Sequence, residues 1–295
     1  MEIFQQGKCG WEASRSGRIL SYDCRERQVR QVMQEMFHPT AIISEKAVIG
    51  QNVRIGAYCV IGDKVSLEDN VTLHSHVIID GNTSVGENCE VFPFAALGLA
   101  PQHTRYNGED SQLIIGKNNI IREYVTFHPG TAVGHMRTVI GDDNLFYVGS
   151  HIAHDCTVGN HVVLANHVNV GGHVEIGNYA YLGGNAAVHP FVRIGSHSII
   201  GGGTAVTADV IPFGLASGPR AALHGLNLVG LRRRGFTAAQ ISAVRGAYSQ
   251  LFVQDGLFAD KLKQLKAEQG SDEMVSLMLS FIEEGQDKNL CQPQK

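Results

Sequence analysis

The sequence lacks an excess of basic residues and any long apolar run, and each absence excludes a class of function. Lys and Arg number 24 against 28 Asp and Glu, so the net charge of −4 provides no basic surface for nucleic acid or an anionic membrane. No apolar run approaches the roughly 18 to 20 residues that span a bilayer. We therefore expect no nucleic-acid partner and no integral membrane segment.

Cysteine is scarce and scattered along the chain. The six cysteines form no Cys-x-x-Cys pair, which argues against a disulfide framework and against a zinc ribbon. We expect buried, reduced thiols, as in a cytoplasmic protein, at Cys9, Cys24, Cys59, Cys89, Cys156 and Cys291.

Glycine and histidine, in contrast, are abundant, with 34 and 14 copies in 295 residues. Glycine at this frequency, without proline enrichment or a three-residue period, indicates a backbone that turns often and tightly. The chain is also longer than the usual domain of about 100 to 150 residues. We expect one large β domain with an attachment.

A six-residue repeat of aliphatic residues or phenylalanine is the strongest pattern in the chain. It runs from Ile43 to Leu97, from Ile115 to Phe127 and from Ile140 to Val206, which gives 25 hexads. An α-helix drifts off a sixfold period, whereas three short strands of a solenoid close one coil of about 18 residues. A β-sandwich does not account for 12 consecutive hexads. The repeat predicts a left-handed parallel β-helix of about eight coils.

The breaks in the repeat set the expected domain boundaries. We expect a polar N-terminal extension at 1–37, the β-helix at 38–213 and an α-helical C-terminal domain at 214–295. The hexad phase resumes after two breaks, so loops of about 98–114 and 128–139 must project from the coils, where solenoids carry function. The extension mixes arginine with acidic residues, which favours a disordered or weakly helical segment over an organelle transit peptide.

Helix signals begin beyond the last hexad. Thr237 and Gln240 form a capping-box pattern, and apolar periodicity carries the predicted helix to about Gln254. Two further amphipathic helices are predicted at 257–268 and 271–284.

Five histidines are expected near one vertical edge of the β-helix, because residues about 18 positions apart stack in successive coils. They are His128, His151, His154, His173 and His189. Three others fall elsewhere and are expected as solvated loop residues: His161, His167 and His197.

The histidine edge allows three interpretations. The histidines could be there only because histidine suits solvent-facing turns; three of them can bind zinc with an open fourth position; or one can act as a general base. For the third, His154 precedes Asp155, and a carboxylate-held imidazole is suited to take a proton near neutral pH.

Several motifs resemble one family of hexapeptide-repeat proteins. SHIAHDCTVGN at 150–160, with HPTAIISEKAVIG, VGGHVEIG, AVHPF and GLNLVGLRRRGF, resembles the UDP-N-acetylglucosamine O-acyltransferase family of lipid A biosynthesis over about residues 38–255. The resemblance implies a cytoplasmic homotrimer with active sites between subunits. It also implies transfer of an R-3-hydroxyacyl chain from acyl carrier protein to the sugar 3-hydroxyl, with no cofactor and no metal.

The resemblance assigns roles to individual residues. It implies His154 as general base beside Asp155, and the Gly172 amide as an oxyanion donor. Substrate-binding positions are implied at Gln102, His103, Arg105, His128, His151, His173, His189, Asn227, Arg233 and Arg234. Ile199 and Gly202 lie where the family sets acyl chain length.

The chain departs from the family pattern at three places. His103 stands where the family has an acidic residue, with Arg105 in place of lysine; Pro190 replaces glutamine; and Val229 stands where an acidic residue is common. A carboxylate accepts hydrogen bonds from sugar hydroxyls more strongly than neutral imidazole does. We therefore expect relaxed or shifted recognition of the nucleotide sugar.

Other functions on the same fold stay open. A γ-type carbonic anhydrase needs a pair of histidines five residues apart, which has no counterpart here. A related N-acyltransferase, an acetyl-CoA-dependent enzyme or a noncatalytic scaffold are the remaining alternatives.

Overall fold

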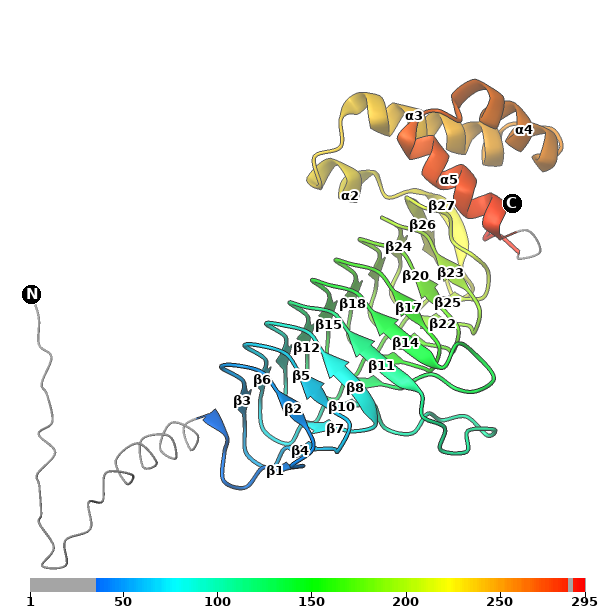
Figure 1. Cartoon of the computed structure of the whole chain (residues 1–295). Coiled ribbons are helices and arrows are strands. Elements are labelled where there is room, and N and C mark those ends of the chain that lie inside the picture. Colours follow the sequence, from blue (N-terminus) through cyan, green and yellow to red (C-terminus); the bar gives the residue numbers. More distant parts are fainter. Residues whose placement is uncertain (1–35, 286–288, 295) are drawn as a thin grey trace, which may run out of the picture.

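A three-sided column of short strands, capped at one end by helices, makes up the protein in a computed structural model that describes residues 36–285 and 289–294 (Figure 1). The expected N-terminal extension, with its transit-peptide alternative, lies outside the described residues apart from its last two positions.

Three sheets form the sides of the column. The first contains β1 (Ile42–Ile43), β4 (Val60–Ile61), β7 (Ile78–Ile79), β10 (Ala96–Leu97), β13 (Thr126–Phe127), β16 (His151–Ile152), β19 (Asn169–Val170), β22 (Ala187–Val188) and β25 (Ala205–Val206). The second contains β2 (Val48–Ile49), β5 (Ser66–Leu67), β8 (Asn82–Val85), β11 (Gln112–Ile115), β14 (Arg137–Ile140), β17 (Thr157–Val158), β20 (Glu175–Ile176) and β23 (Arg193–Ile194). The third contains β3 (Arg54–Ile55), β6 (Thr72–Leu73), β9 (Glu90–Val91), β12 (Ile120–Ile121), β15 (Leu145–Phe146), β18 (Val163–Leu164), β21 (Tyr181–Leu182), β24 (Ile199–Ile200), β26 (Gly214–Ser217) and β27 (Ala222–Leu226).

The predicted hexads coincide with these strands. Each of the 25 periodic residues is the last residue of one of the strands β1 to β25, and all are buried except Ile43 and Ile49 in the first coil. The left-handed parallel β-helix is confirmed. Cys59, Cys89 and Cys156 occupy the buried position two residues earlier, and these three and Cys291 are free thiols, as expected.

Close packing of the coils, and not positive φ, accounts for most glycines that directly follow the periodic residue of a hexad. Positive φ occurs mainly three residues after the periodic aliphatic residue, mostly at Asn, His, Asp and aromatic residues. Glycine follows the aliphatic because coils pack closely: a Cβ on Gly86 would lie 2.6 Å from the carbonyl carbon of Gly116 in the next coil.

Both inserted loops leave the column at the corner between the first and second sheets. They span 98–111 and 128–136, because the four-residue strands β11 and β14 begin a few residues before the expected loop ends. The loops are tied together where the backbone amide of Ala132 donates to the carboxylate of Glu109 at 2.9 Å. Two adjacent loops therefore overhang one corner.

The C-terminal region begins with strands, which corrects the expected α-helical boundary at residue 214. β26 continues the third sheet parallel to β24, and β27 pairs antiparallel with β26. The helices that follow are α2 (Leu228–Arg233), α3 (Ala238–Tyr248) with a π-helical continuation, η1 (Ser249–Val253), α4 (Phe258–Gln269) and α5 (Glu273–Glu284). The capping box at Thr237 and Gln240 is present, and within 36–285 and 289–294 no helix could cross a membrane.

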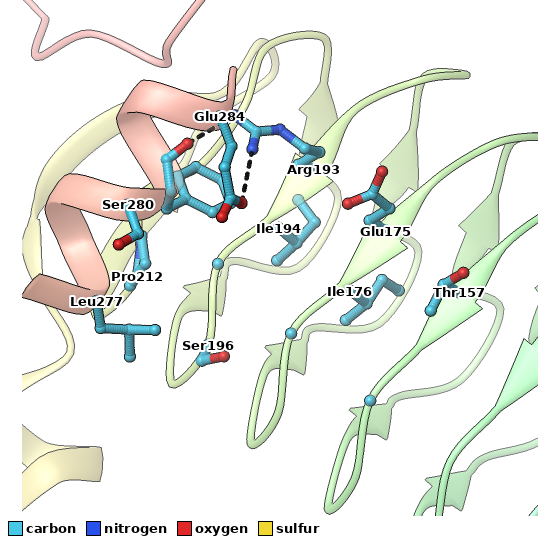
Figure 2. A pocket seen from close by; sticks show the side chains of 14 residues that line it. Thr157, Glu175, Ile176, Arg193, Ile194, Ser196, Pro212, Leu277, Ser280 and Glu284 are labelled. Carbon is cyan, nitrogen blue, oxygen red and sulfur yellow. Dashed lines mark hydrogen bonds and ion pairs between the residues drawn. The ribbon is translucent and has the colours of Figure 1, made fainter. Parts of the chain in front are cut away.

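One buried arginine fastens α5 to the column (Figure 2). Arg193 on β23 donates to Asp209 at 2.7 Å and to the carbonyl of Phe281 at 2.9 Å. Its guanidinium also lies over the Phe281 ring, 4.2 Å from the ring centroid. Arg193 therefore links β23 to α5, and removing one partner of this buried pair would leave an uncompensated charge.

Candidate active site

Asp155 turns the chain from β16 to β17 and is enclosed by the second loop. Its φ of 60° lies in the left-handed region. The Thr131 hydroxyl donates to Oδ2 at 2.6 Å, the Thr131 amide donates to both oxygens at 3.1 Å, and the His135 amide donates to Oδ1 at 2.7 Å. A Cβ on Gly134 would collide with the carboxyl group. The loop is thus folded around this carboxylate.

His154 contacts the side of the Asp155 carboxylate that the second loop leaves open. Burial raises the pKa of Asp155, but hydrogen bonds from Thr131, His154 and the His135 amide outweigh it and lower the pKa overall. Nδ1 of His154 donates to Oδ2 of Asp155 at 2.8 Å, the contact that adjacency in sequence could only suggest. Nε2 is therefore the nitrogen with the free lone pair, and it makes no hydrogen bond to any residue in the described ranges.

Two further imidazoles pack edge-on against the His154 ring. The ring centroid of His103, from the first loop, lies 4.8 Å away, and that of His173, from the corner between β19 and β20, lies 5.1 Å away. His173 also stacks on Phe191, with centroids 4.3 Å apart. Burial, ahead of neighbouring charges, lowers the pKa of His173. His154 thus lies between two imidazole rings, one from the first loop and one from the next coil.

Gly172 faces His154 from the next coil. A Cβ at Gly172 would lie 2.7 Å from Cε1 of His154, so any larger residue would displace the imidazole. The Gly172 amide donates to no other residue that the structure describes. A backbone donor is thereby left available close to His154, and a donor of this kind can stabilise an oxyanion.

His128, directly after β13, and His151 of β16 form a second, more buried pair of imidazoles. Their rings lie edge to face at 4.9 Å, and Nδ1 of His151 is 2.7 Å from the Thr126 hydroxyl. Burial, and then the charges of His151 and His154, lower the pKa of His128 to about 4. Burial also lowers the pKa of His151.

The structure leaves three other assigned positions exposed. His189 lies two coils beyond His154, and its Nδ1 donates to the Pro190 carbonyl at 3.0 Å rather than contacting the cluster. Gln102 and Arg105 are exposed on the first loop, on either side of His103. They border the corner without touching His154.

The remaining assigned residues lie on different parts of the column. Asn227 is buried as the N-cap of α2, accepting from the Gly230 amide at 3.0 Å. Arg233 is exposed on α2, and Arg234 donates to the carbonyl of Tyr179 at 2.9 Å, at the corner between the second and third sheets. Within one chain, α2 therefore lies across the second sheet from His154.

Ile199 and Gly202 also lie away from the histidine corner. Ile199 is on β24 of the third sheet, and Gly202 follows it toward the corner between the third and first sheets. The third sheet is the side of the prism opposite the corner that carries His154. A single chain does not bring these positions to the base.

His197 corrects the expectation of a solvated loop residue. His161 and His167 are exposed, but the His197 ring stacks between Tyr179 and Phe213, at 4.8 and 5.7 Å. Burial, and then the charge of Arg234, lower its pKa to about 4. His197 is a packing residue beneath the helices.

Sequence reasoning missed Thr131 and His135. Neither stands in the hexad register, and no spacing signal links them to Asp155, because a loop of irregular conformation brings them there. A threonine beside glycines in an insertion of a solenoid is the only hint that the sequence offers.

Comparison with known proteins agrees with this architecture. Residues 46–81, 137–172 and 173–208 match a family model described as bacterial transferase hexapeptide (six repeats). Residues 209–291 match a model described as UDP N-acetylglucosamine O-acyltransferase, domain 2.

Relatives cover almost the whole chain. The acyl-[acyl-carrier-protein]--UDP-N-acetylglucosamine O-acyltransferase of Rickettsia bellii is 50% identical over 88% of this chain and 92% of its own length. That of Caulobacter vibrioides is 48% identical, over 88% and 98%. The crystal structure of the Moraxella catarrhalis UDP-N-acetylglucosamine O-acyltransferase superposes with a TM-score of 0.85 at 39% identity, covering 87% of this chain and all of that one. The chain belongs to the UDP-N-acetylglucosamine O-acyltransferase family.

Proposed function

We propose that this protein transfers an R-3-hydroxyacyl chain from acyl carrier protein to the 3-hydroxyl of UDP-N-acetylglucosamine, the first step of lipid A biosynthesis. The observation that carries the proposal is the His154 imidazole, held on Nδ1 by an enclosed carboxylate and packed close to Gly172, whose backbone amide donates to no described residue. Membership in the family supplies the substrates.

His154 does the proton chemistry in this mechanism. A sugar hydroxyl is a weak nucleophile, so Nε2 removes its proton as the oxygen attacks the thioester carbonyl. Asp155 stabilises the imidazolium that forms. The tetrahedral intermediate then collapses, the C–S bond breaks, and the imidazolium returns the proton to the leaving thiolate of the carrier.

Gly172 supports the same step through its backbone. The oxygen of the thioester becomes an oxyanion as the sugar oxygen attacks, and a fixed amide donor stabilises that charge without reorganisation. The proton and the charge are both handled by this chain's own residues, so we propose that turnover needs no metal and no other cofactor.

We further propose that the active site is shared between subunits of a homotrimer. The assigned catalytic and substrate-binding residues lie on two corners of one prism, with His154 on one and Arg233 on α2 at the other. A neighbouring copy can bring its α2 against the histidine corner. Closed cyclic symmetry then repeats that contact three times.

The outer surfaces of the sheets favour the same assembly. Exposed apolar residues mark the first and third sheets, including Ile42, Val60, Ile78, Ile120 and Tyr181. The corner between those two sheets carries a stacked ladder of Tyr58, His76, Phe94 and Tyr124, with ring centroids about 5 Å apart. The second sheet exposes Val48 and Ile114, but it also exposes or half-exposes Ser66, Ser84, Thr157 and Glu175, and its corner with the first sheet carries no stacked ladder of four rings among the described residues. Packing the corner between the first and third sheets against other copies would bury the aromatic ladder and leave the second sheet in solvent.

We place acyl carrier protein near α2 and the acyl chain toward the third sheet of a neighbouring copy. Arg233 and Arg234 offer guanidinium groups to phosphate, which both substrates carry. Ile199 and Gly202 lie on the third-sheet side, where they would face a chain extending from the base. The cytoplasm is the proposed compartment, and the free thiols of the described cysteines fit it.

Product analysis tests the proposal most directly. The purified chain is incubated with UDP-N-acetylglucosamine and a panel of acyl carrier protein thioesters of different chain length, and the products are weighed by mass spectrometry. We expect O-acylated nucleotide sugar as the product. We also expect the enzyme to keep its activity after exhaustive treatment with a chelator. Transfer only to an amino sugar, or only from acetyl-CoA, would favour the alternatives.

A further inference from the structure

The two loops that overhang the His154 corner are joined by one carboxylate. Oε1 of Glu109, on the first loop, accepts from the Ala132 amide of the second loop at 2.9 Å, and Oε2 accepts from the Asn107 amide of its own loop at 2.7 Å. Among the residues that the structure describes, no other side-chain hydrogen bond links the two loops. The mechanism proposed above assigns no task to Glu109.

This bond lies next to the residues that hold Asp155. Ala132 directly follows Thr131, and their consecutive amides donate to different carboxylates, that of Thr131 to Asp155 and that of Ala132 to Glu109. The Thr131 carbonyl accepts from two amides later in the same loop, at 3.0 and 3.3 Å, which makes the segment a compact turn. The His135 amide leaves this turn for Asp155 at 2.7 Å. The same turn is therefore held by Asp155 of the coil and by Glu109 of the first loop.

Glu109 is well placed and charged to hold a neighbouring loop. It lies three residues before β11, whose four residues pair with both β8 and β14, and its carbonyl accepts from the Ser111 amide at 2.8 Å. The carboxylate is therefore close to the end of a paired strand. The hydrogen bonds from the amides of Ala132 and Asn107 lower the pKa of Glu109, so its side chain is ionised at neutral pH. An ionised acceptor makes a stronger hydrogen bond than a neutral one.

We propose that Glu109 is a positioning residue for the base and acts through the second loop. It holds that loop in the conformation in which Thr131 and His135 donate to Asp155. Asp155 in turn holds the His154 ring by Nδ1. A displaced turn would leave a buried carboxylate short of donors, which is costly for a charged group. The link between the loops stands on geometry alone, whereas its effect on turnover rests on the proposed function.

Amide hydrogen exchange tests the link without any turnover. The full chain and its Glu109→Ala variant are transferred to deuterated buffer without substrates, and exchange at single residues is followed by mass spectrometry with fragmentation. The amides of Thr131 and His135 bind Asp155 and not Glu109, so they report on the turn as a whole. We expect their exchange in the variant to be faster by about tenfold or more. Faster exchange at Ala132 alone would overturn the proposal, because the effect of Glu109 would then be local.

Two further variants are the matched controls. Glu109→Gln keeps a carbonyl oxygen that can accept from the Ala132 amide, so it should restore most of the protection and most of the turnover. Asp110→Asn removes the neighbouring acid of the same loop, whose ion pair with Lys64 at 2.8 Å is exposed on both sides and does not reach the second loop. It should match the wild-type chain in both measurements. An equal effect of Asp110→Asn, or no recovery with glutamine, would contradict the proposal.

Kinetics then test the path to the base. Glu109→Ala should lower kcat about tenfold with KM little changed for both substrates, while the melting temperature stays near that of the wild-type chain. Combining Glu109→Ala with Thr131→Val should cost no more than the larger single loss, because both changes act on the same carboxylate. Losses that multiply to about a hundredfold would show that Glu109 does not act through Thr131. A wild-type chain without any acyl transfer would count against the proposed function, and the exchange measurement would still decide the link between the loops.

Discussion

The position of one proton decides whether His154 can work as a base. Because Asp155 is ionised and accepts from Nδ1, the proton of the neutral ring is fixed there and Nε2 is left to react. His154→Ala should lower kcat by about 10² to 10⁴, the usual contribution of a general base, while the chain stays folded. Steady-state kinetics, with circular dichroism as a folding control, check this; turnover near the wild-type level would remove His154 from the mechanism.

Thr131 contacts Asp155, the carboxylate that holds His154. Its hydroxyl and amide both bind Asp155, and the residue is fully buried. Thr131→Val keeps the shape and removes the hydroxyl, which leaves Oδ2 short of one donor. We expect kcat to fall about tenfold with KM little changed, because a lost buried hydrogen bond to a charged group costs about 1 to 3 kcal/mol.

The matched control for Thr131 is serine. Thr131→Ser retains the donor and should recover most of the lost kcat. Thermal melts of both variants separate positioning from stability: if Ser and Val lower kcat and the melting temperature to the same extent, Thr131 is only a packing residue.

At this scale the sequence could suggest the pairing of His154 with Asp155 but not the residues that support Asp155. His154 and Asp155 are adjacent, so their pairing could be suggested from the sequence alone. Thr131 reaches Asp155 only because an irregular loop folds over the corner, and no periodicity describes such a loop. The exposed location of His189 likewise depends on ring direction, which hexad counting does not fix.

Corners of the coil are the elements on which chemistry and stability both depend. The repeat predicted all 25 strands because one buried residue per hexad is a strict requirement of the prism. It did not predict β26, β27 or α2, where the hexads stop and short segments pair with what precedes them. It also assigned His197 to solvent, since the helices that cover that ring come from a distant part of the chain.

That covered corner predicts a dependence of stability on pH. The pKa of His197 is about 4 in the folded chain and about 6.5 when exposed in the unfolded chain, so the unfolded chain takes up the proton first as the pH falls. Stability is therefore retained above pH 6.5 and is lost progressively between 6.5 and 4. Allowing for the partial exposure of His197, we expect a loss of about 1 to 2 kcal/mol from this residue.

His197→Phe isolates this contribution. Nδ1 of His197 is buried without a hydrogen-bond partner among the described residues. Phenylalanine therefore keeps the stack on Tyr179 and Phe213 and leaves no other buried polar group without its partner. Urea unfolding of both proteins at several pH values should show curves that diverge below pH 6.5. Curves that stay parallel down to pH 4 would contradict the assignment.

The whole molecule raises a problem that one chain does not solve. His154 and Arg233 lie on separate corners of the prism, with the second sheet between them. The repeat determines the shape of the prism but contains no information on which sides meet in an assembly. Only the resemblance to the family predicted a shared site, and the exposed aromatic ladder at the corner between the first and third sheets supports that prediction on physical grounds.

Arg233 provides the partner variant needed to test sharing. Its guanidinium is exposed and forms no ion pair with any described residue. Arg233→Ala should weaken the binding of one phosphate-bearing substrate by about ten- to a hundredfold. Arg233→Lys should recover only part of that affinity, because an ammonium group lacks the planar fork of a guanidinium. Titrating each substrate against the purified variants measures this; unchanged affinity for both would make Arg233 a solvated surface residue.

Mixed trimers would show whether the two corners belong to different chains. If His154 of one subunit works with Arg233 of the next, a subunit lacking His154 still offers an intact Arg233, and a subunit lacking Arg233 still offers an intact base. Co-expressing His154→Ala and Arg233→Ala chains in equal amounts should then restore about a quarter of the sites, since one pairing in four brings both intact residues together. Assayed under conditions where each variant alone is nearly inactive, the mixture should approach a quarter of wild-type turnover. If each site were confined to one chain, every site would carry one lesion and the mixture would show only the average of the two variants.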